Sequence, residues 1–429
     1  MIDLKKLREN RAEYEAGFKK KRADIDVNKV LALDEKHRTL IREVEKMRAE
    51  KNEVSKAIPK LADKERGAKI REMKELGEKL DASEAELNKI SVQLKELCLA
   101  IPNPPDESVP EGADDADNEV IKTVGKIPKF AFEPLDHIAL GEKLDLIDME
   151  TGAKTSGARF YYLKNEAVLL EFALIQWLLR KFTEAGFTPV TVPMLVKEEM
   201  MYATGFFPAD KNEIYTVNPS HEKNPEGDDL YLVGTSEVPM AGLHMFKPIT
   251  DIDNLPKRYI GFSSCFRREA GSYGKDTKGI LRVHQFDKLE MFSFCHPSQS
   301  LKEHDFLLSI EEEILSELGL PYRVVNICGG DLGAPAAKKY DCEVWIPTQG
   351  KYRELTSCSN CTDFQARRGG IKYKDDTGTH LLHTLNGTAM ASTRTLIAIL
   401  ENFQQKDGSV RVPKVLQSYM NGIKEIKPK

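Results

Sequence analysis

Residues 266–294 read FRREAGSYGKDTKGILRVHQFDKLEMFSF and are the most informative stretch of this chain of 429 residues. An apolar segment, 259–266, ends at two arginines and a glutamate, a glycine-rich segment follows, and a segment of alternating character runs over 281–294. Two extended runs joined by such a loop predict an antiparallel hairpin. Guanidinium groups at its mouth suit phosphate, and Phe286 offers a ring on which a base can stack.

The glycines of this stretch do not follow the phosphate-loop pattern, because no Gly-Lys-Ser/Thr occurs at the required spacing. A nucleotide bound here would therefore lie on a sheet rather than in a strand-to-helix loop. Taken alone, an Arg-Arg-Glu cluster beside a turn is more often a solvated surface, since charged side chains are mostly exposed. The residues by themselves leave both interpretations open.

Composition and length favour a soluble globular protein with two or more domains, since 41% of the residues are apolar and 31% are charged. No apolar run approaches the ~20 residues of a membrane helix, and the first residues, MIDLKKLREN, lack the apolar core of a signal peptide. We therefore expect a cytoplasmic protein that does not contact membranes. The seven scattered cysteines are typical of free thiols in a reducing compartment.

The one Cys-x-x-Cys pair, Cys358 and Cys361, has no second pair and no histidine at ligand spacing, so we expect no zinc. A thioredoxin-like context is also missing around it. The other notable pair, His380 and His383, is expected to pack or hydrogen-bond locally.

Two heptad seams in the first hundred residues predict an antiparallel helical hairpin. The first helix, 27–58, would be about 48 Å long and ends at Pro59, and residues 60–67 supply a break before the second helix. The seam positions are Val30, Leu33, His37, Leu40, Val44, Met47, Lys51, Val54 and Ile58, then Met73, Leu76, Leu80, Ser83, Leu87, Ile90, Leu94 and Leu97.

Charge differs between this hairpin and the rest of the chain. Residues 1–100 carry 25 Lys/Arg against 21 Asp/Glu, a net charge of +4, and the other 329 residues carry 38 against 47, a net charge of −9. A mildly basic arm on an acidic body permits localised RNA contact. Periodicity alone favours a dimerising coiled coil or a spacer as much as an RNA-binding arm.

Beyond the hairpin, the proline-rich and acidic residues 101–129 predict a linker. Residues 165–185 predict an apolar helix closed by Gly186, and residues 392–403 predict the last helix.

Three motifs in order resemble those of class II aminoacyl-tRNA synthetases. The opening stretch resembles motif 2, and its wording, FRREAGSYGKDTKG with HQFDKLEMF, is similar to that of the seryl-tRNA synthetases. Gly186-Phe187 through Val190 to Pro193 matches motif 1, and residues 386–388 (Asn-Gly-Thr) followed by Arg394 match motif 3.

The resemblance covers essentially the whole chain and implies an α+β protein. An N-terminal antiparallel helical-hairpin coiled-coil arm (1–102) would bind tRNA, a linker (103–128) would follow, and a class II catalytic domain (129–429) would contain an antiparallel sheet flanked by helices. The implied activity is ATP-dependent activation of L-serine to seryl-adenylate with release of pyrophosphate, then transfer of serine to the 3′ end of a serine-accepting tRNA with release of AMP. Mg²⁺ would accompany ATP, and motif 1 would form a homodimer. Charging of a selenocysteine-type tRNA stays open.

The matched motif positions imply roles for individual side chains. Arg267 would bridge the α-phosphate and the amino-acid carboxylate, Arg394 would hold the far end of the triphosphate, Glu269 would accept a bond from the adenine amino group, and Phe286 would stack on the ring. Glu354 and Ser357 of the sequence ELTS would face magnesium and phosphate. The implied ATP-binding set is Arg267, Arg268, Glu269, Val283, Phe286, Glu354, Leu355, Thr356, Ser357 and Arg394, and the implied serine-binding set is Thr235, Ser236, Glu237, Glu290 and Thr388.

The chain departs from the family at three places: Arg268 and Thr388 stand where serine is frequent, and residues 203–208 match the usual loop only approximately. Lys275 and Lys278 either reach the tRNA acceptor end or are simply solvated.

Two other functions are alternatives to this one. A catalytically silent paralogue that binds RNA would be expected to lack Arg267, Glu354 or Arg394, and all three are present. A ligase that serves another carrier would be expected to have a truncated arm, and the arm appears full length.

Overall fold

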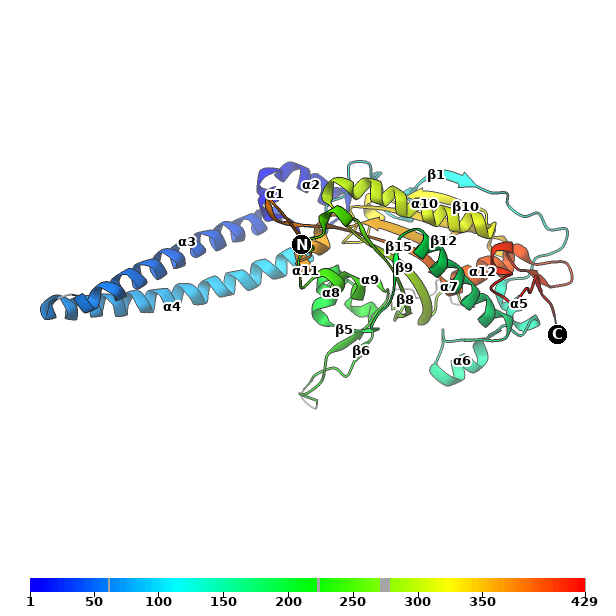
Figure 1. The fold of residues 1–429 in the computed structure, drawn as a ribbon, viewed down its shortest axis with the longest axis horizontal. Coiled ribbons are helices and arrows are strands. Elements are labelled where there is room, and N and C mark those ends of the chain that lie inside the picture. Colours follow the sequence, from blue (N-terminus) through cyan, green and yellow to red (C-terminus); the bar gives the residue numbers. More distant parts are fainter. Residues whose placement is uncertain (61, 222–223, 271–277, 429) are drawn as a thin grey trace. The chain divides into compact units, whose positions relative to one another are not determined.

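The computed structural model describes residues 1–60, 62–221, 224–270 and 278–428. The chain divides into two compact units, of which the first contains residues 1–19 and 23–102 and the second contains residues 20–22 and 103–429. Figure 1 shows the helical first unit in blue and the mixed second unit in cyan to red.

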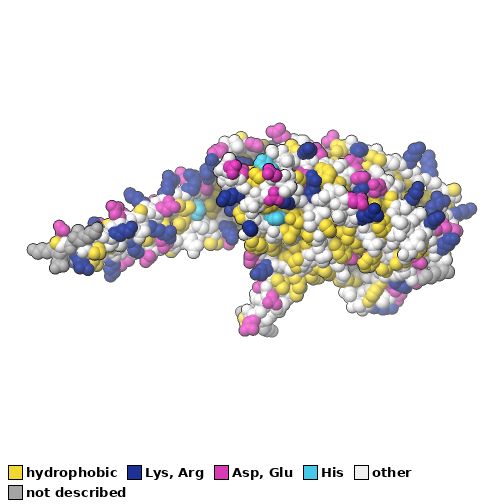
Figure 2. All heavy atoms as spheres, viewed as in Figure 1, with side chains coloured by type: hydrophobic (Ala, Val, Ile, Leu, Met, Phe, Trp, Pro, Cys, Tyr) yellow, Lys and Arg dark blue, Asp and Glu magenta, His cyan; other side chains and the backbone are white. Residues whose placement is uncertain are grey.

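The first unit is built around a long helical hairpin, with helices α1 (Leu4–Glu9), α2 (Arg11–Lys20), α3 (Val27–Ala57) and α4 (Asp63–Ala100). Each predicted seam position on α3 and α4 is buried or half-buried, which confirms both seams. The polar seam residue His37 pairs through Nε2 with Ser91 Oγ at 2.9 Å, across the two helices. Positive and negative side chains alternate over the surface of this hairpin (Figure 2).

The predicted break at residues 60–67 is too long, because α4 already begins at Asp63. Gly67 therefore lies inside the helix, where a single glycine costs only about 1 kcal/mol relative to alanine. The packed seam that follows it offsets such a cost, and this tertiary contribution is invisible to local propensity.

The second unit contains the helices and strands of a mixed domain. Its helices are α5 (His137–Lys143), α6 (Met149–Ser156), α7 (Glu166–Glu184), α8 (Glu198–Thr204), α9 (Glu237–Ala241), α10 (Ser300–Leu318), α11 (Phe364–Gly369) and α12 (Ser392–Phe403). The strands of the main sheet are β1 (Glu119–Val124), β4 (Thr188–Thr191), β8 (Lys257–Phe266), β9 (Gln285–Cys295), β10 (Tyr322–Asn326), β11 (Lys338–Ile346), β12 (Lys351–Asn360) and β15 (His383–Ala391). The short strands are β2 (Ile147–Asp148), β3 (Tyr162–Leu163), β5 (Leu195–Lys197), β6 (Thr216–Val217), β7 (Leu230–Leu232), β13 (Lys372–Asp375), β14 (Gly378–Leu381), β16 (Val410–Arg411) and β17 (Glu425–Ile426).

The main sheet has the order β1-β10-β11-β12-β15-β9-β8-β4. All neighbouring strands pair antiparallel except β4 and β8, which pair parallel at one edge. Helix α10 packs on β12, β15 and β9, and α12 packs on β11, β9 and β15. The predicted α+β class, with an antiparallel sheet flanked by helices, is confirmed.

The predicted hairpin of the opening stretch is formed by β8 and β9, which pair in register from Lys257↔Phe294 to Phe266↔Gln285. Its second strand begins at Gln285 rather than at residue 281. Before Gln285 the chain keeps one backbone bond to the end of the first strand, from the Arg267 N–H to the His284 carbonyl at 3.0 Å, because the His284 N–H donates to the Arg159 carbonyl at 3.2 Å instead. Residues 281–283 thereby become part of a cleft wall instead of a strand.

Two further helices were predicted correctly, whereas the predicted linker contains a strand. The helices predicted at 165–185 and 392–403 are observed as α7 and α12, and Gly186, with φ +84°, follows α7 as predicted. Residues 103–128, predicted to form a linker, include β1, which pairs with β10 at the edge of the sheet. None of the helices that the structure describes combines the length and the apolarity that crossing a bilayer requires.

Candidate active site

A cleft lies over the strands β8, β9, β12 and β15. Two of its residues are Arg267, directly after β8, and Arg394, in the first turn of α12. The complete lining is Arg267, Glu269, Leu281, Arg282, Val283, Phe286, Lys288, Glu354, Leu355, Ser357, Thr388, Ala391, Thr393 and Arg394. Sheet pairing therefore brings the arginines of motifs 2 and 3, which are far apart in the sequence, into one cavity.

One face of the sheet carries this cleft, and α10 covers the other. Adjacent residues of a strand point to opposite faces, and this alternation is visible in β12. The Thr356 hydroxyl donates to Glu311 Oε2 on α10 at 2.9 Å, whereas Ser357 lines the cleft. Of the predicted ATP-binding residues, Thr356 thus turns its side chain away from the cleft and is not part of its lining.

Arg394 is held by Glu354, through both the backbone and the side chain. Its Nη1 donates to the Glu354 carbonyl at 3.0 Å and lies 3.4 Å from Glu354 Oε2. Confinement in the cleft would raise the pKa of Glu354, but the positive charges of Arg394, Lys339 and Arg267 lower this pKa to about 2. With this lowered pKa the carboxylate of Glu354 stays ionised. Because the side chain is 44% exposed, the carboxylate is also accessible from the cleft.

Arg267 is positioned by its neighbours on both sides. Its Nε and Nη2 donate to the Gly234 carbonyl at 3.4 and 3.3 Å, and its guanidinium carbon lies 5.4 Å from the centre of the Phe286 ring. The backbone N–H of Arg267 donates to the His284 carbonyl at 3.0 Å, which extends the pairing of the hairpin past Phe266.

Glu269 and Arg282 face each other at one end of the cleft. Arg282 Nη1 lies 3.3 Å from Glu269 Oε2, and Glu269 has a positive φ of +50°, which turns the chain as it leaves the cleft. Arg268 does not line the cleft, and its N–H donates to the Glu213 carbonyl at 2.9 Å.

A buried polar cluster adjoins the arginines. Lys288 Nζ lies 2.6 Å from Glu290 Oε2 and donates to Thr235 Oγ1 at 3.1 Å. Thr388 Oγ1 donates to the same Glu290 oxygen at 3.2 Å. These four side chains come from three segments, and each is at most 7% exposed. They can bond the hydroxyl, ammonium or carboxylate of a small polar molecule.

Two of the predicted serine-binding residues lie apart from this cluster. Ser236 pairs with Ser263 Oγ at 2.8 Å inside the core, and Glu237 accepts bonds from Gln365 Nε2 at 2.7 Å and Asn386 Nδ2 at 3.1 Å. Burial, together with the nearby Glu290 carboxylate, raises the pKa of Glu237 to about 7, although the two amide bonds oppose the shift.

Sequence reasoning missed Lys288 and Arg282. The signal for Lys288 is present in the alternation of β9, where Phe286, Lys288 and Glu290 share a face. No comparable signal marks Arg282, because residues 281–283 are not in a strand. Lys278 is exposed, and Lys275 lies outside the described residues.

One member of the histidine pair makes a local contact of the predicted kind. His380 Nε2 pairs at 2.9 Å with Oγ1 of Thr377, which lies three residues earlier, in the turn between β13 and β14. Cys358 and Cys361 are fully buried free thiols. In the described part of the chain, no group of three or more His, Cys, Asp or Glu side chains is arranged to hold a metal ion.

Comparison with known proteins identifies the family. The profile of the "Seryl-tRNA synthetase N-terminal domain" matches residues 1–105, and that of the "tRNA synthetase class II core domain (G, H, P, S and T)" matches residues 215–403. A serine–tRNA ligase of Thermobifida fusca is 48% identical over 422 residues, which cover 98% of this chain and 97% of that protein.

Two solved structures are similar over nearly the whole chain. The seryl-tRNA synthetase of Pyrococcus horikoshii, solved in complex with ATP, has a TM-score of 0.91 and 40% identity, with 100% of both chains covered. The cytoplasmic serine–tRNA ligase of Naegleria fowleri, in complex with AMP, has a TM-score of 0.86 and 35% identity, with 98% of this chain and 96% of that chain covered. The chain therefore belongs to the seryl-tRNA synthetase family of class II aminoacyl-tRNA synthetases.

Proposed function

We propose that this chain activates L-serine with ATP and transfers the serine to tRNA. The observation that carries the proposal is the convergence of Arg267 and Arg394 on one cleft, beside the buried cluster of Thr235, Lys288, Glu290 and Thr388. The guanidinium groups neutralise the negative charge of a triphosphate, and the cluster offers hydrogen-bond partners to a small polar amino acid.

Activation is an in-line displacement at phosphorus. An oxygen of the serine carboxylate attacks the α-phosphorus, the bond from this phosphorus to the bridging oxygen breaks, and pyrophosphate leaves with the electron pair. Arg267 neutralises the charge that develops on the α-phosphate, because a guanidinium bonds two oxygens at once and keeps its proton. Arg394, braced by Glu354, holds the far end of the triphosphate. Phe286 and the wall formed by residues 281–283 accommodate the base, with Glu269 as acceptor for its amino group.

Glu354 and Ser357 are the residues that would hold magnesium with ATP. The ionised carboxylate of Glu354 and the hydroxyl of Ser357 line the same cleft, and Mg²⁺ prefers such oxygen ligands together with phosphate. The bound ion supplies charge neutralisation at the phosphates. The local residues fit this role because Glu354, with its pKa lowered to about 2, needs no proton loss to bind a cation.

Serine is selected by the buried cluster. Glu290 and Thr388 offer acceptors and a donor for the hydroxyl of a hydroxymethyl side chain, and Lys288 offers a positive charge for a carboxylate. A site built around a hydroxyl rejects alanine, since the polar groups of the site would be left unpaired. Within this pocket, Thr235 bonds Lys288 and keeps the ammonium in place.

The helical hairpin is proposed to contact the tRNA, with residues 1–102 as the tRNA-binding arm, 103–128 as a connection and 129–429 as the catalytic domain. The arm carries a net charge of +4 over residues 1–100, and basic side chains are distributed along its surface (Figure 2). Such side chains form ion pairs with phosphate groups of nucleic acids.

The second step of the reaction is the transfer of serine to the tRNA. The carbonyl carbon of serine forms a bond to a ribose hydroxyl oxygen at the tRNA end, the bond from this carbon to the phosphate oxygen of the adenylate breaks, and AMP leaves.

A homodimer is proposed from apolar side chains that the single chain leaves exposed. Phe172 on α7 is 55% exposed, and Leu169, Met194 and Leu195 are about 40% exposed; Figure 2 shows a broad apolar area on the face of the second unit that it presents. Exposed apolar patches of this kind mark protein interfaces. The cytoplasm is proposed as the compartment, which also keeps the seven thiols reduced.

The test is amino-acid-dependent exchange of pyrophosphate into ATP with each of the twenty amino acids, followed by aminoacylation assays with serine-accepting tRNA. We expect exchange with serine alone and stable charging of the tRNA. A silent paralogue would show no exchange. A ligase for another carrier would show exchange without tRNA charging.

A further inference from the structure

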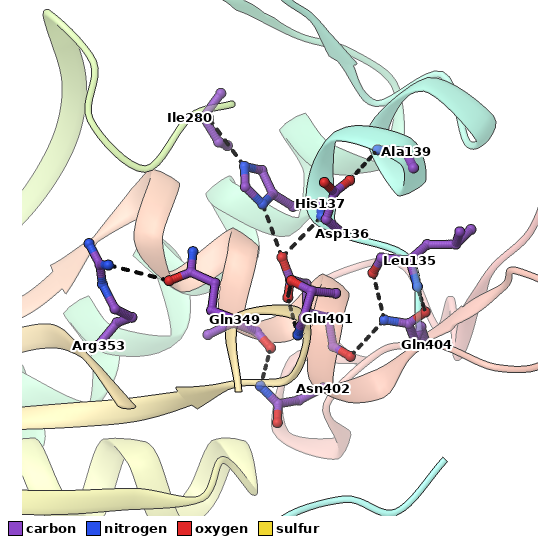
Figure 3. A network of polar contacts seen from close by, with 12 residues as sticks. Leu135, Asp136, His137, Ala139, Ile280, Gln349, Arg353, Glu401, Asn402 and Gln404 are labelled. Atoms are coloured by element: carbon purple, nitrogen blue, oxygen red, sulfur yellow. Dashed lines mark hydrogen bonds and ion pairs between the residues drawn. The ribbon is translucent and has the colours of Figure 1, made fainter. Parts of the chain in front are cut away.

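A polar network outside the cleft connects α5 with two segments that contribute to the cleft, α12 and residues 280–283 (Figure 3). At its centre is His137, the first residue of α5, whose Nδ1 lies 3.0 Å from Glu401 Oε1 on α12. On the other side of the ring, the Ile280 N–H donates to His137 Nε2 at 3.3 Å. The His137 side chain is 7% exposed and the Glu401 side chain is fully buried. Neither residue lines the cleft.

The carboxylate of Glu401 determines which nitrogen of His137 carries the proton. Glu401 accepts the backbone N–H of His137 at 3.1 Å, and it also accepts the N–H and the hydroxyl of Thr348, at 3.3 and 2.6 Å. Because a carboxylate only accepts, the contact with Nδ1 requires a proton on Nδ1. Nε2 of the neutral ring is then the acceptor that the Ile280 N–H requires, and both bonds are made at once.

The backbone around His137 is held independently of the ring. Gln404, just beyond α12, bonds both backbone groups of Leu135, as an acceptor at 2.8 Å and as a donor at 2.9 Å. Asp136 caps the start of α5 by accepting the Ala139 N–H at 2.8 Å. The ring therefore projects from a fixed base.

The backbone of Gly279 lies in close contact with the His137 ring. Gly279 has a φ of +67°, and a Cβ built on it would lie 2.0 Å from His137 Nε2, so only glycine fits. Ile280, the next residue, is fully buried. Leu281, Arg282 and Val283 then form a wall of the cleft. The position of His137 thus decides where this wall begins.

We propose that His137 and Glu401 are a positioning pair that sets the affinity of the cleft for ATP, with no contact to the nucleotide itself. This inference rests on the proposed function. Glu401 orients the ring, the ring fixes the backbone at Ile280, and residues 281–283 are thereby held at the distance that the base requires. The serine cluster lies on β9, on β15 and, through Thr235, on the segment before α9, and it does not depend on the bond to Ile280.

The experiment compares His137→Ala, His137→Gln and His137→Asn by steady-state pyrophosphate exchange and by calorimetric titration of ATP into the protein without serine. Loss of one buried hydrogen bond corresponds to about a five- to tenfold change. We expect His137→Ala to raise the KM and Kd for ATP by about that factor, with the KM for serine unchanged. Gln places its amide oxygen where Nε2 stood and should recover most of the ATP affinity, whereas Asn reaches only the Nδ1 position and should not.

Thr348→Val is the matched control, since it removes the hydroxyl bond to Glu401, keeps the backbone N–H bond of residue 348 to Glu401, and keeps the bond between His137 and Ile280. It should lower the melting temperature without changing the Kd for ATP. An unchanged Kd in His137→Ala, or equal values for the Gln and Asn variants, overturns the proposal. If His137→Ala does not fold, the comparison of Gln with Asn decides. Absence of serine-dependent exchange in the unmodified protein would refute the proposed function instead, while the ATP titration still tests the pair.

Discussion

Replacement of Glu290 by glutamine tests the serine pocket most directly. Glu290 is 2% exposed, and one of its oxygens lies 2.6 Å from Lys288 Nζ and 3.2 Å from Thr388 Oγ1. Glu290→Gln keeps the volume of the side chain and one acceptor but removes the negative charge. Hydrogen bonds to charged groups contribute about 1.5–3 kcal/mol. We therefore expect kcat/KM for serine to fall roughly 10- to 150-fold.

Alanine at this position would be a poorer test of recognition. It leaves the ammonium of Lys288, which is 7% exposed, with Thr235 as its remaining partner in the cluster. Removing one member of a buried ion pair typically costs about 3–5 kcal/mol of folding free energy. An inactive Glu290→Ala protein could simply be unfolded at the assay temperature.

The assay is pyrophosphate exchange at varied serine and at varied ATP, with the melting temperature measured in parallel. Glu303→Gln is the matched control, because Glu303 is also a buried carboxylate in an ion pair, with Arg258 Nη2 at 2.7 Å, but on the α10 side of the sheet. It should lower stability and leave kcat/KM for serine unchanged. A folded Glu290→Gln protein with normal kcat/KM for serine would remove Glu290 from the pocket.

Three further outcomes are expected. Arg394→Lys loses the fork that spans the phosphates, so kcat for exchange should fall by about 10²–10³; near-normal kcat would contradict its role. Burial raises the pKa of Glu237 to about 7, so its protonated form favours folding and this stability is lost as pH rises from about 4.5 to about 7. The melting temperature of Glu237→Gln relative to the unmodified protein should therefore increase from pH 5 to pH 8, and parallel curves would refute the shift. Neutralising Lys275 and Lys278 together should weaken aminoacylation and spare exchange; equal loss in both assays would argue against a tRNA contact.

Most of the elements were predictable because their signals are local and periodic. The heptad seams predict α3 and α4 since a two-helix hairpin must bury one stripe of each helix, and every seam position is at least half-buried. The helix Ser392–Phe403 was predicted with its observed bounds. Two boundaries were misplaced, at Asp63 and at Gln285, where tertiary packing or a bond to a distant carbonyl overrode the local pattern.

The motifs identified the site but did not reveal which of their residues face it. Contiguous sets such as 235–237 and 354–357 contain neighbours that point to opposite faces of a strand or into the core. Ser236 bonds Ser263 in the core and Thr356 bonds Glu311 on α10. Lys288, by contrast, is missing from the predicted site residues. The two-residue alternation of β9 places it on the same face as Phe286 and could have identified it.

The sequence by itself determined the family, the helical arm, the hairpin of β8 and β9 and the order of the three motifs, because each depends on residue types at fixed short spacings. Only the tertiary structure decided that Arg267 and Arg394 share a cleft, that Lys288 neutralises Glu290, and that His137 is fixed between Glu401 and Ile280. These contacts join segments separated by many residues, and their energy depends on burial and distance. Neither quantity exists until the sheet has brought the segments together.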